Sequence, residues 1–176
     1  MEIIRIFEDS NKLFAFKYKG DKDNIYDKTI DLWTDVFYVR SFLIKQKKDL
    51  PKGKTIDALV DKVLKSAEKL DDTIIYLGSN EGNRLEELFK PLDNLEQNLD
   101  IVLSKQKGAE SYLRIYALKI DTNLFVITGS TIKFTKYLDE RNHTQEQVLL
   151  LDKCRNYLRD NDVMDSDSFF EFLDQN

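Results

Sequence analysis

The residues that could do chemistry are concentrated in one basic stretch in the second half of the chain. Between Ile101 and Tyr137 there are six basic residues and two acidic ones, a local balance of +4 in a chain of net charge −5. The six are Lys105, Lys107, Arg114, Lys119, Lys133 and Lys136. Clustered lysine and arginine side chains can neutralise the phosphates of a nucleic acid. The stretch therefore predicts a local polyanion-binding surface.

Arg114 and Tyr116 are two positions apart in a segment whose apolar and aromatic content predicts a β-strand. Alternate side chains of a strand point to opposite faces. We expect Leu113, Ile115 and Ala117 to face the core, and Arg114 and Tyr116 to share the open face. There an arginine could hold a phosphate and a tyrosine could stack on a base. The alternative is a solvated sheet face or an Arg–Tyr packing pair.

His143 is the only histidine, and it follows Lys133, Lys136 and Arg141 closely in the sequence. An unperturbed imidazole titrates near pH 6.5, so His143 could exchange a proton at neutral pH. Alternatively, His143 is an ordinary partly exposed residue just ahead of a helix, because Thr144–Gln147 has the pattern of a capping box.

Cys154 is the only cysteine, so an intrachain disulfide is impossible and a reducing compartment is expected. We expect a small buried residue on a helix at this position. No Cys/His cluster is present, so we predict no metal and no cofactor. The sequence has neither a signal-peptide pattern nor an apolar run long enough to cross a membrane, which predicts a cytoplasmic protein without membrane contact.

The first half of the chain is predicted to form a hairpin followed by helices. Residues 2–8 and 12–19 have hairpin character, and 25–50 has the spacing of one long amphipathic helix. A second helix is expected over 56–70. Residues 72–77 fit either a short strand or a last helical turn.

The second half is predicted to contain a short helix at 84–89 and then strands at 112–120 and 124–135, with a bulge or bend at Gly129–Ser130. A helix from Thr144 and a short last helix after Asp165 follow. Because strands and helices occur in blocks, the fold class is α+β: a small antiparallel sheet flanked by helices, with an N-terminal hairpin and helical extension.

A single domain is expected for the 176 residues. It would comprise the hairpin and helical part (1–83), a central part (84–160) and an acidic tail (161–176). The net charge of −5 argues against indiscriminate nucleic-acid binding. One further hypothesis is that the tail covers the basic face, anchored by Phe169 and Phe170; the alternative is a solvated terminal helix.

The order of motifs from Arg84 to Leu158 resembles the RelE/ParE superfamily of bacterial toxins, and most of all its HigB (phage Gp49-like) branch. The motifs are Leu-Phe-Lys-Pro-Leu (88–92), Leu-Arg-Ile-Tyr (113–116), Phe-Val-Ile-Thr-Gly (125–129) and Ile-Lys-Phe-Thr-Lys (132–136). The resemblance implies a toxin that cleaves mRNA on the ribosome, or acts on another target such as gyrase. It also implies an antitoxin partner, of the helix-turn-helix type.

The resemblance also implies roles for individual residues. Cleavage by a ribose 2′-hydroxyl needs a base, an acid and cations at the scissile phosphate. The candidate catalytic residues are Arg114, Lys133, His143 and Tyr116; the candidate RNA-binding residues are Lys105, Lys107, Lys136 and Arg141. A competing hypothesis is a non-enzymatic protein-binding domain that keeps the fold, because the chain is acidic whereas ribosome-directed nucleases of this group are usually basic.

Overall fold

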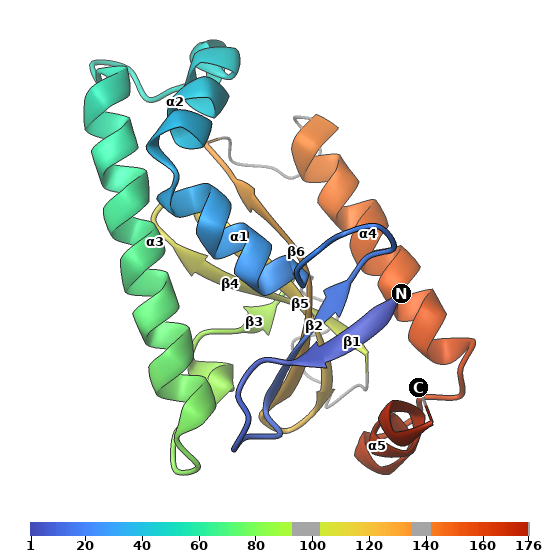
Figure 1. The fold of residues 1–176 in the computed structure, drawn as a ribbon. Helices are drawn as coiled ribbons and strands as arrows, with labels where there is room; N and C mark the ends of the chain where they lie inside the picture. Colours follow the sequence, from blue (N-terminus) through green and yellow to red (C-terminus); the bar gives the residue numbers. More distant parts are fainter. Residues whose placement is uncertain (93–102, 135–141, 176) are drawn as a thin grey trace.

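The computed structural model describes residues 1–92, 103–134 and 142–175 (Figure 1). The strands are β1 (Glu2–Arg5), β2 (Leu13–Lys17), β3 (Lys90–Pro91), β4 (Ser104–Glu110), β5 (Leu113–Asp121) and β6 (Leu124–Ile132). The helices are α1 (Ile25–Thr34), α2 (Val36–Lys45), α3 (Ile56–Ser79), α4 (Asn142–Arg159) and α5 (Ser166–Asp174), with 3₁₀ turns at Lys47–Asp49 and Leu85–Glu87. None of these helices is long and apolar enough to span a bilayer.

The strands form one sheet in the order β1-β2-β6-β5-β4-β3. All neighbouring pairs are antiparallel except β2 and β6, which run parallel with Leu13 opposite Phe125. The predicted α+β class with a largely antiparallel sheet is therefore confirmed. The predicted N-terminal hairpin is β1–β2, and it extends the sheet that the second half of the chain builds.

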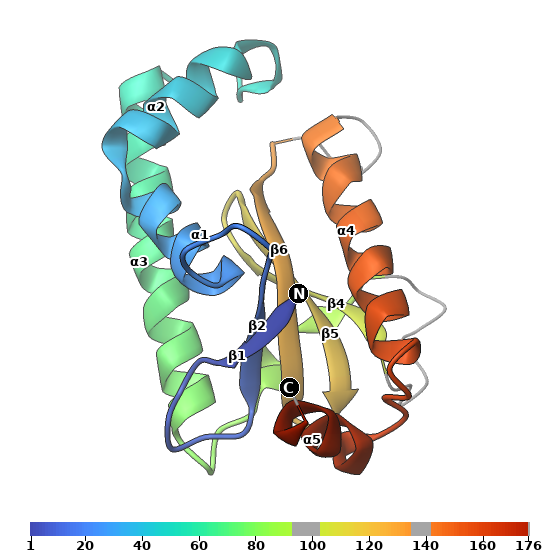
Figure 2. The same ribbon diagram turned by 45° about the vertical axis from the view of Figure 1, so that its right-hand side comes forward.

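Helices cover both faces of the sheet (Figure 2). The α1–α3 layer packs on one face and α4 with α5 on the other, so that the apolar residues form two separate clusters. Leu113, Ile115 and Ala117 lie in the first cluster, as the sequence predicted. Tyr116 and Leu118 lie in the second. The expectation that the Tyr116 face is open was therefore wrong: a central strand that is apolar on both sides is buried on both sides.

The predicted helix over 25–50 is two helices. Asp35 separates them, because its carboxylate accepts hydrogen bonds from the backbone N–H groups of Phe37 (2.7 Å) and Tyr38 (3.1 Å). Its backbone is extended (φ −80°, ψ 109°), which ends α1 and starts α2 in a new direction. The apolar spacing alone did not reveal this break, since an aspartate inside an amphipathic pattern is usually on the solvent side.

The second predicted helix is confirmed but longer than expected. Thr55 caps α3, with its hydroxyl accepting from the N–H of Ala58 at 3.2 Å, and the helix continues through 72–77 to Ser79. Of the two options for 72–77, the helical one is therefore correct. The ammonium of Lys12 lies at the end of α3 and donates to the carbonyls of Glu81 (2.9 Å) and Asn83 (3.0 Å).

Strand β4 was missed by the sequence analysis, because Ser-Lys-Gln-Lys-Gly-Ala-Glu has no β-branched or aromatic residue. The predicted irregularity in β6 is present one residue earlier than expected. Gly129 pairs with Tyr116 and Ile127 with Ala117, so Thr128 is the extra residue. Its carbonyl accepts a hydrogen bond from the Tyr18 hydroxyl. Tyr18 directly follows β2, so this hydrogen bond joins the end of β2 to the bulge of β6.

The two C-terminal helices agree with the sequence pattern. Helix α4 begins at Asn142, two residues before the expected cap, and α5 begins after the N-cap Asp165, which forms a capping box with Ser168. Phe169 is fully buried in the second cluster, with its ring 5.2 Å from that of Phe14 at a near-perpendicular angle. Helix α5 is thus packed on the sheet, and Phe169 is one of its anchors, as the hypothesis about the tail predicted.

Candidate functional site

Four of the predicted site residues lie on the same face of the sheet, the face that α4 covers. Lys105 and Lys107 alternate on β4, and Lys107 lies directly opposite Tyr116 on β5. Arg114 lies opposite Ala109 on β4 and Thr131 on β6. Cross-strand partners share a face of a sheet. The antiparallel pairing of β4, β5 and β6 therefore brings together cations that are up to nine residues apart in sequence.

Arg114 and Lys107 form the centre of this group. The guanidinium of Arg114 donates through Nη1 to the carbonyls of Ser111 and Leu113, both at 2.7 Å. Partial burial lowers the pKa of Arg114. Burial and the positive charge of Arg114 together lower the pKa of Lys107. The strand register places Lys107 diagonally across from Arg114 on the neighbouring strand, so the two positive charges are neighbours on one partly buried face.

Neither cation has a carboxylate partner among the residues that the structure describes. Partly buried charges are normally paired, because removing an ion from water without a partner costs free energy. A bound anion would relieve both the repulsion and the desolvation, and two adjacent nitrogen donors suit a phosphate. We refer to Lys107 and Arg114 as the cation pair.

Lys105 is on the same face but is already engaged. Its ammonium lies 2.9 Å from the carboxylate of Asp152 on α4, and its side chain is only 12% exposed. Arg155 donates to the same carboxylate at 3.0 Å. The acidic residues of the second half therefore do reach the basic face, but they do so through α4. The sequence analysis missed Asp152, although its spacing of three from Arg155 on a helix is a recognisable signal.

Tyr116 is not available to a ligand in this structure. Its side chain has 0% exposure, and no described residue hydrogen-bonds its hydroxyl. Burial raises its pKa to about 12. The predicted role in stacking on a base requires an exposed ring, so this expectation is corrected: Tyr116 is part of the second cluster. Gly129 lies opposite it and lets Gln147 of α4 approach the sheet closely.

Two of the remaining predicted residues, Lys133 and His143, lie in described parts on either side of residues 135–141. Lys133 follows β6 directly, and its backbone N–H donates to the carbonyl of Tyr112 at 2.8 Å. His143 lies in the first turn of α4, and its side chain is outside the described part. Lys136 and Arg141 are also outside the described residues. Of these residues, the structure therefore places only the backbone of Lys133 beside the start of β5.

Cys154 is a buried residue of α4, as expected. Its sulfur lies 3.2 Å from the hydroxyl of Tyr18, and burial raises the pKa of the thiol to about 11. A thiol in that state is a poor nucleophile at neutral pH. Cys154 is therefore a packing residue of the second cluster.

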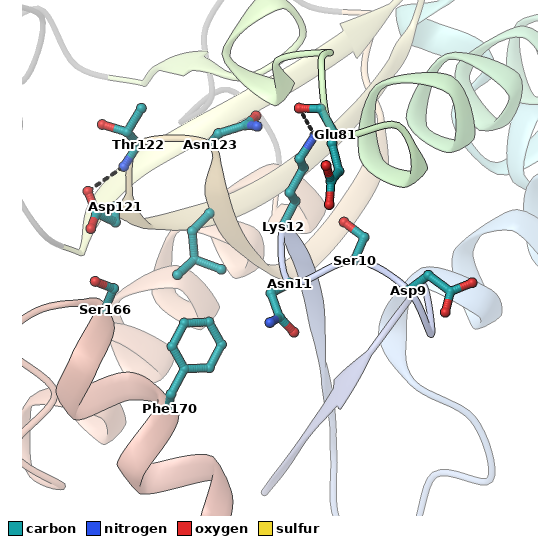
Figure 3. Close-up of a pocket in the computed structure, with 11 residues that line it drawn as sticks. Asp9, Ser10, Asn11, Lys12, Glu81, Asp121, Thr122, Asn123, Ser166 and Phe170 are labelled. Atoms are coloured by element: carbon teal, nitrogen blue, oxygen red, sulfur yellow. Dashed lines mark hydrogen bonds between the residues drawn. The ribbon is translucent and has the colours of Figure 1, made fainter.

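A separate pocket of about 440 Å³ lies between the β1–β2 turn, the loop after α3, the β5–β6 turn and the start of α5 (Figure 3). Its one lysine, Lys12, points at the end of α3 and is bound by backbone carbonyls there. The carboxylates of Asp9, Glu81 and Asp121 line the same pocket. This balance disfavours an anion, so the pocket does not compete with the cation pair as a phosphate site.

Within the described parts of the chain, no three His, Cys, Asp or Glu residues are arranged to hold a metal ion. In comparisons with known proteins, no family model, no curated protein and no solved structure matched this chain.

Proposed function

We propose that this chain is the toxin component of a bacterial type II toxin–antitoxin pair, acting in the cytoplasm on RNA. The observation that supports the proposal is the cation pair: two half-buried cations, diagonal neighbours on β4 and β5, without a carboxylate partner in the described residues. Such an arrangement favours a phosphate over water or a neutral ligand. The RelE/HigB-like motif order supplies the biological context.

The chemistry proposed for this site is cleavage of mRNA on the ribosome: a ribose 2′-hydroxyl attacks the adjacent phosphorus, the bond from phosphorus to the 5′-oxygen breaks, and a 2′,3′-cyclic phosphate and a 5′-hydroxyl result. Arg114 and Lys107 stabilise the charge that develops on the scissile phosphate. Lys133, next to the end of β6, contacts the same strand of RNA. His143 is the acid–base candidate, since Tyr116 is enclosed and its pKa is raised to about 12. A helix-turn-helix antitoxin is the expected inhibitor.

The growth of a bacterium that expresses the chain tests this proposal. We expect induction of the unmutated chain to arrest growth and to truncate mRNAs, as measured by primer extension. The double variant Lys107→Ala/Arg114→Ala is expected to restore growth, because it removes the phosphate contacts. The matched control is Lys22→Ala/Arg159→Ala, which removes one lysine and one arginine from exposed positions elsewhere. It should remain toxic.

Normal growth with intact mRNA under the unmutated chain would contradict the proposal. It would favour the second candidate, a non-enzymatic protein-binding domain that keeps this fold. Two observations favour that alternative: α4 encloses Tyr116 and neutralises Lys105, and α2 carries large exposed apolar side chains. Growth arrest without mRNA cleavage would instead indicate a toxin with another target.

A further inference from the structure

Helix α2 has an apolar surface on the side that faces away from the protein. Val39 and Leu43 are fully buried in the first cluster and attach the helix to α3. On the other side, Phe37 is 83% exposed and Ile44 is 53% exposed. These two residues are seven positions apart, two helical turns, so they lie on one line along the helix, with the small Ser41 between them.

Exposed lysines follow this line, at the C-terminal end of α2 and in the segment after it. From Val36 to Lys54 there are six basic residues and one acidic one, a balance of +5 in a chain whose net charge is −5. Arg40 forms an ion pair with Asp57. No ion pair among the described residues involves the other five, which are all exposed: Lys45, Lys47, Lys48, Lys52 and Lys54.

The end of α2 is also hollowed. Ile44, Lys45, Lys47 and Lys48 line an open hollow of about 700 Å³ together with Gln46 and Asp49. The apolar line therefore continues into a concave, positively charged surface. A single exposed apolar residue would need no explanation, but an aligned pair beside a hollow is typical of an interaction site.

We propose that α2 and the segment after it, Val36–Lys54, dock an acidic amphipathic helix of a partner protein. Apolar residues of the partner at i, i+4 and i+7 would pack along Phe37 and Ile44, over Ser41, in a helix-to-helix contact. Carboxylates near one end of that stripe would face the lysines at the end of α2, which would speed association and set the orientation.

The shape of the surface favours a helix over other anionic partners. The exposed apolar residues of α2 also include Val36 (47%) and Tyr38 (36%), but the two most exposed, Phe37 and Ile44, have the spacing that suits the apolar stripe of another helix. A nucleic acid would be recognised by lysines alone and gives no role to an aliphatic side chain such as Ile44. The surface is on the α1–α3 side of the sheet (Figure 2), whereas the cation pair shares the face of Tyr116, which α4 covers. The inference therefore does not depend on the proposed function.

The test uses the full chain and a fluorescent model peptide, with binding measured by anisotropy. The peptide is a helix with leucines at i, i+4 and i+7 and glutamates on both flanks; a scrambled peptide of the same composition is its control. We expect the ordered peptide to bind at least about tenfold more tightly than the scrambled one, a difference that corresponds to about 1.4 kcal/mol.

Variants of the chain locate the binding on α2. Phe37→Ser/Ile44→Ser is expected to abolish the preference for the ordered peptide. Leu149→Ser/Met164→Ser, which changes two other exposed apolar residues (69% and 66%), should leave that preference unchanged. All four positions are on the surface, and unfolding curves check that each variant is folded.

A charge reversal provides the second arm. The variant Lys45→Glu/Lys48→Glu is expected to bind the acidic peptide more weakly. It should instead bind a peptide in which lysines replace the glutamates. Equal binding of ordered and scrambled peptides, or undiminished binding by the Phe37/Ile44 variant, would overturn the proposal. The proposal would also be overturned if the chain bound phosphatidylglycerol vesicles or single-stranded RNA more tightly than the acidic peptide and the same variants abolished that binding. The surface would then serve a lipid or a nucleic acid.

Discussion

Arg114 and Tyr116 show how differently two neighbouring residues on one strand face can be used. Arg114 is at the end of β5, where the guanidinium reaches backbone carbonyls and keeps partial contact with solvent. Tyr116 lies two residues further along, under α4, and is fully enclosed. Alternation along the strand places both residues on one face. Arg114 is there a candidate ligand contact, whereas Tyr116 is a packing residue.

Gly78 gives a prediction at the residue scale. It is buried in α3, and a Cβ atom there would lie 2.3 Å from the nearest ring carbon of Phe7, so an added methyl group forces the ring to move. Replacing glycine by alanine inside a helix usually raises the stability of the protein by about 1 kcal/mol. Here we expect Gly78→Ala to lower the free energy of unfolding by about 1–3 kcal/mol, as overpacking does. Urea unfolding curves measure the change.

Two variants separate this clash from other causes. Gly82→Ala is the control, because nothing lies within 4 Å of its added Cβ, and it should change stability little. When Gly78→Ala is made in a chain that already carries Phe7→Ala, it should lower the free energy of unfolding much less than in the unmutated chain, because the ring is then absent. Independent, additive effects of the two substitutions would rule out the contact.

At the scale of elements, the angle between α1 and α2 determines where the exposed line of α2 points. Asp35 joins the two helices: its extended backbone ends α1, and its carboxylate caps α2. Without the cap, the first backbone N–H groups of α2 lose their partner. The orientation of Phe37, the second residue of α2, depends directly on that turn.

Asp35→Ala is expected to lower the free energy of unfolding by about 0.5–2 kcal/mol, the usual cost of losing a helix N-cap. It should also weaken the binding of the model peptide, because Phe37 is within the uncapped turn. Thermal unfolding and anisotropy provide the two measurements. Asp35→Asn keeps an accepting oxygen and should behave nearly as the unmutated chain. Asp31→Ala, an exposed aspartate inside α1, is the control; a loss as large as that of Asp35→Ala would refute the capping role.

For the whole molecule, the feature that matters most is the sharing of one sheet by two apolar clusters. Strands β2, β5 and β6 each contribute side chains to both. The parallel pairing of β2 with β6 makes the N-terminal hairpin part of the same sheet as the cation pair. If these strands separate, the apolar side chains of both clusters become exposed to water.

This arrangement predicts that both clusters unfold together. Trp33, the only tryptophan, reports on the first cluster through its fluorescence, and Cys154, the only cysteine, reports on the second through its reaction with a thiol reagent. We expect the two probes to give the same urea midpoint, as in a two-state transition. Separate midpoints would show that the α1–α3 side and the α4–α5 side unfold independently.

The amino-acid sequence by itself determined most of the local structure. Caps at Thr55 and Asp165, the alternation in Leu113–Ala117 and the polar break after Glu8 act through neighbouring residues, so their consequences can be predicted without tertiary contacts. The grouping of Arg114 with Tyr116 on one face was also local. Strand β4 was not predictable in this way, because its polar residues form a strand only through pairing with β5.

Only the tertiary structure decided which of those face residues meet solvent. Alternation tells which side chains share a face, but not what covers that face. Helix α4, some thirty residues further along the chain, encloses Tyr116 and pairs Asp152 with Lys105, while Lys107 and Arg114 keep no carboxylate among the described residues. The free energy of burial and ion pairing depends on these long-range contacts, and so the candidate site is a property of the folded chain.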